Sequence, residues 1–214
     1  MATTLTAEPW ALTGEAMAGL SQLGLDEDQI EAAVGVISMF NYFTRVADAT
    51  GIEFDYLTPL PAFKPDMAQD AAPRPVRSVG PAPVAVAAAR PRPRPRYQKL
   101  QLAWETWRAY EMETDEPLSR RERRVLACAA AEETADWDGA EALSERKSPG
   151  GNDYVLGGFA RKLSRQPWRM GGGDLEGLRA AGYSEVAVLH AISVVAHQNA
   201  DSRLVTGLRA AGRS

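Results

Sequence analysis

The apolar residues of the N-terminal part recur with the spacing of a helix. Between residues 26 and 50 they stand three or four positions apart, at Ile30, Val34, Ile37 and Phe40. This spacing places them on one face of an α-helix with 3.6 residues per turn. The side chain of Asp26 suits a helix N-cap, and Gly51 is a residue at which helices commonly end. The pattern therefore predicts a long amphipathic helix that ends at Gly51.

The C-terminal part shows helical periodicity in five segments. Ser119 is followed three residues later by Glu122, which is the pattern of a capping box at a helix start. Strand-like alternation of polar and apolar residues is nearly absent. The chain is therefore predicted to be all-α. The five expected helices cover about 98–113, a segment starting at Ser119, about 153–164, a short segment capped by Asp174, and a long segment capped by Ser184 that contains both histidines.

A proline-rich segment separates the two helical parts, from about residue 57 to residue 97. Its last residues read ARPRPRPRY, with proline at every second position. Proline lacks a backbone N–H and fixes φ, so this segment is expected to be extended and to lack a packed core. The predicted organisation is an N-terminal helical part, 1–56, a Pro/Arg-rich linker, 57–97, and a C-terminal helical domain, 98–214.

The linker also concentrates positive charge. No Asp or Glu occurs between Ala71 and Trp104, whereas seven Lys and Arg residues do, so this segment carries +7. Because the whole chain carries −4, the remaining residues carry −11. The main interpretation is a solvated spacer, and the alternative is a strip that docks on an acidic surface or on nucleic acid. No aromatic residue lies among the arginines to stack on bases, so a nucleic-acid partner is not expected.

The overall composition is that of a soluble globular protein, with 45% hydrophobic residues. No apolar run reaches the length of a membrane span, and the first residues lack the basic and apolar regions of a signal peptide. We therefore expect a cytoplasmic protein without a membrane partner. Cys128 is the only cysteine, which excludes an internal disulfide, a dithiol redox pair and an all-cysteine metal site within one chain.

The sequence also resembles itself at a distance of 158 residues. This shift aligns residues 9–45 with residues 167–203 without a gap, and 11 of the 37 aligned positions are identical. The pattern predicts that the same helical hairpin occurs twice. Asn41 and Arg45 recur as Asn199 and Arg203, and shared residues are most simply explained by structure. His190 and His197 have no counterpart, because Ala32 and Met39 stand at the corresponding positions.

The residues around the two recurring asparagines point to a family. The stretches MFNYFTRVADATG around Asn41 and HQNADSRLVTG around Asn199 resemble the carboxymuconolactone decarboxylase and AhpD-like (alkylhydroperoxidase) superfamily. The stretches PLSRRERRVLACAAAEE, YVLGGFARKLSRQP and DLEGLRAAGYSEVAVLHAISVVA resemble it in order and spacing. The resemblance covers residues 98–214 as one complete unit and residues 8–56 as a half-unit. It implies an AhpD-like helical bundle and a homo-oligomer assembled by helix packing.

The thiol chemistry of the AhpD-like branch does not fit this chain. The resemblance implies a CxxCxxxH motif at the start of a helix, where one thiolate reduces a peroxide and the second cysteine resolves the sulfenate. The corresponding stretch, residues 131–143, reads AEETADWDGAEAL and contains neither cysteine nor histidine. Cys128 lies earlier, in an alanine-rich run, and is expected to be a buried small residue. Alkylhydroperoxidase activity is therefore the least favoured function.

Carboxylates stand where the resemblance would place the thiols. Glu132 and Glu133, followed by three further acidic residues up to Glu141, could act as general acids or bases in a buried pocket. The alternative is the solvated end of a helix that has lost its site. The resemblance implies that the superfamily includes cofactor-independent decarboxylase-like members that act on small carboxylated substrates.

The two histidines and the Asn–Arg pair complete the candidate site. His197 is a candidate base oriented by Asp201 one turn later, and His190 would face the same side of the helix. The alternative is that both histidines pack or face solvent, and two histidines with one carboxylate are poor evidence for a metal. Arg203 and Asn199 could position a substrate carboxylate, or Arg203 could form a structural ion pair.

These residues lead to two functional hypotheses. The first is a non-thiol enzyme that acts by acid–base chemistry on a small organic substrate, as in a specialised biosynthetic or catabolic pathway, without cofactor or metal. Glu132 or Glu133 and His197 would be its acid and base, with Arg203, Asn199 and His190 binding the substrate. The second is a catalytically degenerate scaffold or interaction protein that keeps the helical architecture. The sequence identifies neither the substrate nor the oligomeric state.

Overall fold

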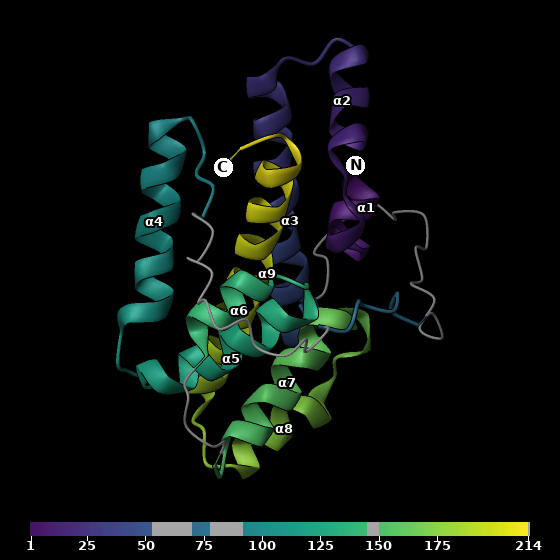
Figure 1. Ribbon diagram of the computed structural model, residues 1–214. Helices are drawn as coiled ribbons and strands as arrows, with labels where there is room; N and C mark the ends of the chain where they lie inside the picture. The colour runs from purple at the N-terminus through teal and green to yellow at the C-terminus, as the bar shows by residue number, and fades with distance from the viewer. Residues whose placement is uncertain (53–69, 78–91, 145–149, 214) are drawn as a thin grey trace, which may run out of the picture.

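The computed structural model describes residues 1–52, 70–77, 92–144 and 150–213, and these residues form helices and no strands. The all-α prediction is therefore confirmed for this part of the chain. Figure 1 shows α3 and α9 side by side in the middle, with α4 on one side, α1 and α2 on the other, and α5 to α8 at one end. The helices are α1 Ala2–Ala7, η1 Pro9–Ala11, α2 Gly14–Gln22, α3 Glu27–Thr50, α4 Gln98–Glu113, α5 Arg120–Glu133, α6 Trp137–Leu143, α7 Asp153–Arg165, η2 Pro167–Arg169, α8 Gly172–Ala180 and α9 Glu185–Ala210, where η1 and η2 are 3₁₀ turns.

The local capping signals explain most helix starts. Asp26 and Ser119 each form a complete capping box, and the Ser184 side chain accepts the backbone N–H of the third residue of α9. The prediction for Asp174 is wrong. The helix α8 begins at Gly172, and the Asp174 carboxylate accepts the backbone N–H of Gly171 instead of capping from outside. Since glycine has no side chain that can cap, the acidic residue two positions inside the helix takes over this role.

The two long helices, α3 and α9, run antiparallel. Val34 near the start of α3 lies against Gly207 near the end of α9, and Tyr42 further along α3 contacts Ser193 earlier in α9 through a 3.2 Å hydrogen bond. The end of α9 packs with α1, α3 and α4 in one apolar cluster, while its beginning packs with α5, α7 and α8 in another. Both apolar clusters therefore depend on the placement of α9.

The stretches aligned by the 158-residue shift contain the same succession of elements. In each, a 3₁₀ turn that starts with Pro-Trp is followed by a nine-residue helix and then by a long helix. The starts of η2, α8 and α9 all lie 158 positions after those of η1, α2 and α3. Gly24 and Gly182 link the short and the long helix in each stretch, with φ of 90° and 95°. Such positive φ values favour glycine at both turns.

Within the residues that the structure describes, no single helix is long and apolar enough to cross a membrane. The bent pair of α8 and α9 would meet that length and composition only when taken together.

The close approach of α3 and α9 makes Gly207→Ala a sharp test of this packing. A Cβ atom at Gly207 would lie well inside van der Waals contact with the stiff, branched side chain of Val34. We expect a loss of about 1–3 kcal/mol in the free energy of unfolding, measured by urea titration. The matched control is Gly177→Ala in α8, where no atom lies within 4 Å of the new Cβ, and which should be neutral or slightly stabilising. Equal effects of the two substitutions would contradict the close packing.

Candidate functional site

The stretch of residues 131–143 forms a tight break between α5 and α6. Ala135 adopts a positive φ of 56°, and the Asp136 carboxylate then caps α6 by accepting the backbone N–H of Gly139 at 3.1 Å. A Cβ at Gly139 would collide with that carboxylate, so the turn needs glycine there. Asp136 thus sets the start of α6 within this stretch.

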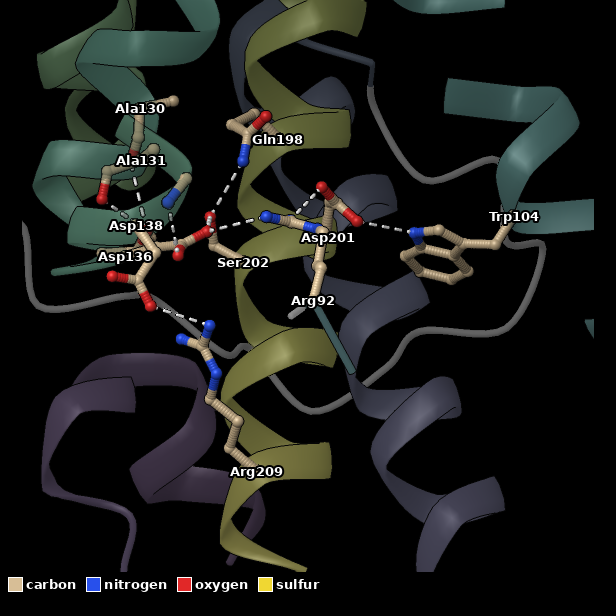
Figure 2. Close-up of polar contacts among 12 residues, drawn as sticks. Arg92, Trp104, Ala130, Ala131, Asp136, Asp138, Gln198, Asp201, Ser202 and Arg209 are labelled. Carbon is tan, nitrogen blue, oxygen red and sulfur yellow. Dashed lines mark hydrogen bonds and ion pairs between the residues drawn. The ribbon is translucent and has the colours of Figure 1, made fainter. Parts of the chain in front are cut away.

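Asp136 is buried and connects α6 to α9. Its Oδ2 atom accepts a hydrogen bond from the Ser202 hydroxyl at 2.9 Å, and Ser202 in turn accepts one from the Gln198 amide at 3.0 Å. Figure 2 shows this chain of contacts along one side of α9. The carboxylate is thus held by a cap on one side and a hydroxyl on the other. Such a satisfied network favours a rigid structural role.

Arg92 of the linker joins Asp136 to a second buried carboxylate. Its guanidinium lies 3.7 Å from Asp136 Oδ2 and forms an ion pair and hydrogen bond with Asp201. The other oxygen of Asp201 accepts the indole N–H of Trp104 at 2.9 Å, as Figure 2 shows. Two carboxylates from α6 and α9 therefore share one arginine. This Asp136–Arg92–Asp201 cluster is the centre of the candidate site.

The described part of the linker contacts the helical body through its arginines, whereas Pro73, Pro75 and Val76 are exposed. The expectation of a solvated spacer is therefore wrong for Arg92, Pro93 and Pro95. The described arginines of the linker pair with carboxylates of the same chain, while Pro93 and Pro95 between them are buried. The acidic surface considered as a docking partner is thus on this chain itself. Arg90 lies outside the described residues. The further pairs are Arg74–Glu133 at 3.1 Å, Arg77–Glu141 at 2.5 Å, Arg94–Glu105 at 3.5 Å and Arg96–Glu27 at 2.7 Å.

The acidic residues proposed as acids or bases all have arginine partners. Glu132 pairs with Arg161 at 3.2 Å, and the mostly buried Glu133 lies between Arg74 and Arg165, with Arg161 at 3.8 Å. Asp136, Asp138 and Glu141 pair with Arg92, Arg209 and Arg77, respectively. The carboxylates are therefore arranged as one half of an ion-pair network.

Glu132 also borders a cleft of about 240 Å³ between α5 and α7. Its walls include Arg121, Arg124 and Arg161, together with Cys128. Burial, reinforced by the nearby Glu132, raises the pKa of the Cys128 thiol to about 11. The thiol is therefore protonated at neutral pH, which is unsuited to nucleophilic attack.

A second cleft, of about 780 Å³, borders the cluster itself. Asp201, Trp104 and Arg92 line it together with Arg108.

His197 is buried in an aromatic environment. Its ring lies edge-on to Trp107 at 4.6 Å and near Trp104 at 6.5 Å, and neither ring nitrogen has a hydrogen-bond partner. Burial lowers the pKa of His197 to about 4, although the nearby charge of Asp201 partly opposes this. The expected orientation by Asp201 is not formed, because that carboxylate binds Trp104 and Arg92. The ring is therefore neutral and packed under α4.

His190 occupies a different environment. It is half-buried, its Nδ1 lies 3.4 Å from the guanidinium of Arg123, and its ring lies 6.3 Å from that of Tyr110. Arg123 is itself fully buried and donates to backbone carbonyls between α4 and α5. The two histidines face α4 but have no contact with each other. They do not form a working pair.

Asn199 and Arg203 lie at the centre of the interface between the aligned stretches. Arg203 donates to the Asn199 side chain at 2.9 Å and to the carbonyl oxygen of Thr6 at 2.7 Å. Arg45 makes the matching contacts with Asn41 at 2.8 Å and with the carbonyl oxygen of Ser164 at 3.0 Å. Thr6 and Ser164 are themselves 158 positions apart. Each arginine thus crosses to the end of the helix that precedes the other stretch.

Burial dominates the electrostatics of these two arginines. Desolvation lowers the pKa of Arg45 to about 10 and also lowers that of Arg203, which lies near the charge of Arg45. Neither Nε atom has a hydrogen-bond partner. The carbonyls at helix ends carry partial negative charge and compensate the guanidinium groups, and the nearby charge of Asp48 adds to this for Arg45. Both arginines are committed to structure and unavailable for a substrate.

Of the six candidate site residues, the structure joins only some. Asn199 contacts Arg203, and Glu132 and Glu133 share Arg161, but His197 has no hydrogen bond to any of them. Among the described residues, no group of three or more His, Cys, Asp or Glu side chains could hold a metal ion.

Sequence reasoning missed the role of Arg92 and the buried Glu111, which accepts hydrogen bonds from Ser193 at 2.6 Å and Trp107 at 3.2 Å.

The fold and the site define an all-helical protein with a buried Asp–Arg–Asp cluster. No protein-family model, curated protein or solved structure matches the chain. The family resemblance therefore stays a prediction.

Removal of Arg92 should be costly because it leaves two buried carboxylates facing each other. For Arg92→Ala we expect a loss of about 2 kcal/mol in unfolding free energy, measured by urea titration, since the arginine is one-third exposed. The control Arg94→Ala removes a mostly exposed pair and should cost at most about 0.5 kcal/mol. Adding Asp201→Asn to Arg92→Ala should restore part of the loss. Additive losses would contradict the shared ion pair.

The burial of His197 predicts a dependence of stability on pH. In the unfolded chain His197 binds a proton near pH 6.5, whereas in the folded protein it does so only near pH 4. The unfolded state therefore binds more protons between these values, and stability falls as the pH is lowered through this range. Relative to His197→Met, the wild type should lose about 3 kcal/mol between pH 7 and pH 4 in urea titrations. A pH-independent difference would show that His197 is not buried as a neutral ring.

Proposed function

We propose that the chain is a cytoplasmic, non-thiol AhpD-like helical protein that serves as a scaffold or interaction protein. Its residues 98–214 would form one complete unit and residues 1–56 a preceding half-unit that supplies a second hairpin. The equal succession of elements and the reciprocal contacts of Arg45 and Arg203 support this arrangement. The half-unit then takes the place that a hairpin of another subunit would fill.

One observation carries the proposal of a scaffold. Arg92 lies between Asp136 and Asp201, at the helix start where the resemblance implies the thiols. All five acidic residues from Glu132 to Glu141 are paired with arginines, three of them from the linker. A catalytic acid or base must reach its substrate, whereas Glu133, Asp136 and Glu141 hold the linker on the bundle and Glu132 and Asp138 pair with arginines of α7 and α9. The ion pairs of this site therefore hold the linker and the helices together.

A second candidate function is favoured by the cleft of about 240 Å³ beside α5. Three arginines and Glu132 border it, which would suit acid–base chemistry on a small organic acid. In this alternative Glu132 is the general acid or base, because it is one-third exposed and faces the cleft. His197 has no part in it, since it does not line the cleft.

The two functions differ in their response to small organic acids and quinones. The scaffold proposal expects no turnover of any such compound, measured by product analysis, and no shift in melting temperature that depends on Glu132. Glu132→Gln keeps the shape of the cleft and removes only the charge, and Glu141→Gln is the matched control outside the cleft. Turnover that is lost in Glu132→Gln but kept in Glu141→Gln would replace the scaffold by the enzyme.

A further inference from the structure

The cleft of about 780 Å³ lies between the linker, α4 and α9, and each of these elements contributes one wall. Figure 1 shows the teal segment that leads into α4 lying between α4 and α9. A cleft of this size is within the range of sites that bind small organic molecules. It shares no lining residue with the cleft beside α5, so the second candidate function does not use it.

Positive charge exceeds negative charge at this cleft. The acidic side chains on its walls are already engaged. Arg92 binds Asp201, and Arg94 lies 3.5 Å from Glu105. One arginine therefore remains in excess. The charged residues that line the cleft are Arg92, Arg94, Arg108, Glu105 and Asp201.

Arg108 is the arginine without an acidic partner. Within the ranges that the structure describes, its side chain forms no hydrogen bond or ion pair. The linker cannot supply a partner, because no Asp or Glu occurs between Ala71 and Trp104. Arg108 is exposed and lines the cleft, so an anionic group in the cleft can reach it. A carboxylate matches the fork of a guanidinium group with two parallel hydrogen bonds.

An apolar wall lies one helical turn from Arg108. Trp104 precedes Arg108 by four residues on α4, so the two side chains share a face of the helix. The indole N–H of Trp104 is bound to Asp201, which leaves the carbon surface of the ring for apolar contacts. A ligand of this cleft therefore needs an apolar body beside its anionic group. The other buried apolar residues on the walls are Pro93, Pro95, Leu204 and Val205.

The acidic residues of the cleft favour a small ligand with a single charge. A nucleic acid or an acidic peptide would bring many negative charges close to Glu105 and Asp201, and like charges in contact are unfavourable. A single carboxylate can bind Arg108 alone. A flat aromatic ring suits the neighbouring wall, because aromatic rings pack favourably on tryptophan. The chemistry of the cleft thus selects an aromatic carboxylate.

We propose that the cleft between the linker, α4 and α9 binds a small aromatic carboxylate, with its carboxylate on Arg108 and its ring against Trp104. This binding site goes beyond the scaffold role and does not depend on it. The ion pair of Arg92 with Asp201 stays formed and serves as part of the wall. Because the ligand contacts the linker, α4 and α9 together, its binding stabilises the attachment of the linker.

Isothermal titration calorimetry on the full chain tests the binding with cinnamate as the probe. Cinnamate should bind saturably, and Arg108→Gln should raise its Kd at least tenfold, because a charge-assisted pair of hydrogen bonds is lost. The matched control is Lys99→Gln, which removes an exposed positive charge from the same helix outside the cleft and should leave the Kd unchanged. Circular dichroism verifies that both variants are folded.

The uncharged analogue cinnamamide separates the contribution of the carboxylate from that of the ring. It should bind the full chain as weakly as cinnamate binds Arg108→Gln. Cinnamate that does not bind saturably at millimolar concentration overturns the proposal, as do equal effects of Arg108→Gln and Lys99→Gln.

Methyl NMR spectroscopy locates the bound cinnamate. The methyl signals of Val205, which lines this cleft, should shift during the titration, whereas those of Val125 in the cleft beside α5 should not. Shifts confined to Val125 would place the ligand in the other cleft and overturn the proposal. Turnover that depends on Glu132 would instead overturn the scaffold proposal and leave this binding site intact.

Discussion

The packing of α3 against α9 depends on two buried arginine side chains, Arg45 and Arg203, that each reach across to a helix end. Charged groups are costly to bury, and here the compensation comes from backbone carbonyls of Thr6 and Ser164 together with the asparagine one turn earlier. Helix ends leave carbonyls without partners inside the helix, so the same contact satisfies both sides. The two hairpins are thereby locked in one relative orientation, and the remaining helices pack on the frame that this pair provides.

A second set of electrostatic contacts joins the linker to the helices that pack around α3 and α9. The body of the protein carries an excess of negative charge, and the linker carries an excess of positive charge. Pro93 and Pro95 of the linker are buried while the neighbouring arginines pair with acidic residues of the body, so a segment without helix or strand still binds along a defined path. Since proline has few accessible backbone conformations, little conformational entropy is lost when it is fixed. The interaction of Arg92 with Asp136 and Asp201 is the most buried of these contacts.

The sequence predicted features that depend on neighbouring residues, such as helix caps. It did not predict contacts between residues that are far apart in the sequence. Asp26, Ser119 and Ser184 were identified as caps because a cap involves only the next three residues. The break at Ala135, which starts α6, carries no glycine to mark it, and the start of α8 was displaced because glycine offers no side chain there.

In the site, Arg92 forms ion pairs with Asp136 and Asp201, which lie 44 and 109 positions later in the sequence. Periodicity contains no information on such pairings. His197 is buried because Trp104 and Trp107 of α4 cover it, and two tryptophans three residues apart were the available signal.

The reciprocal arginine contacts also have a consequence for how the chain acquires its structure. Arg45 donates a hydrogen bond to Ser164, which lies 119 residues later in the chain. Thr6 accepts one from Arg203, which lies 197 residues later. During synthesis the first hairpin therefore emerges long before its counterpart, with Arg45 uncompensated and one side of α3 open. Contacts of such long separation form late, since the loop-closure entropy is lost before they contribute. The N-terminal hairpin therefore gains its final contacts only after both α7 and α9 have been synthesised.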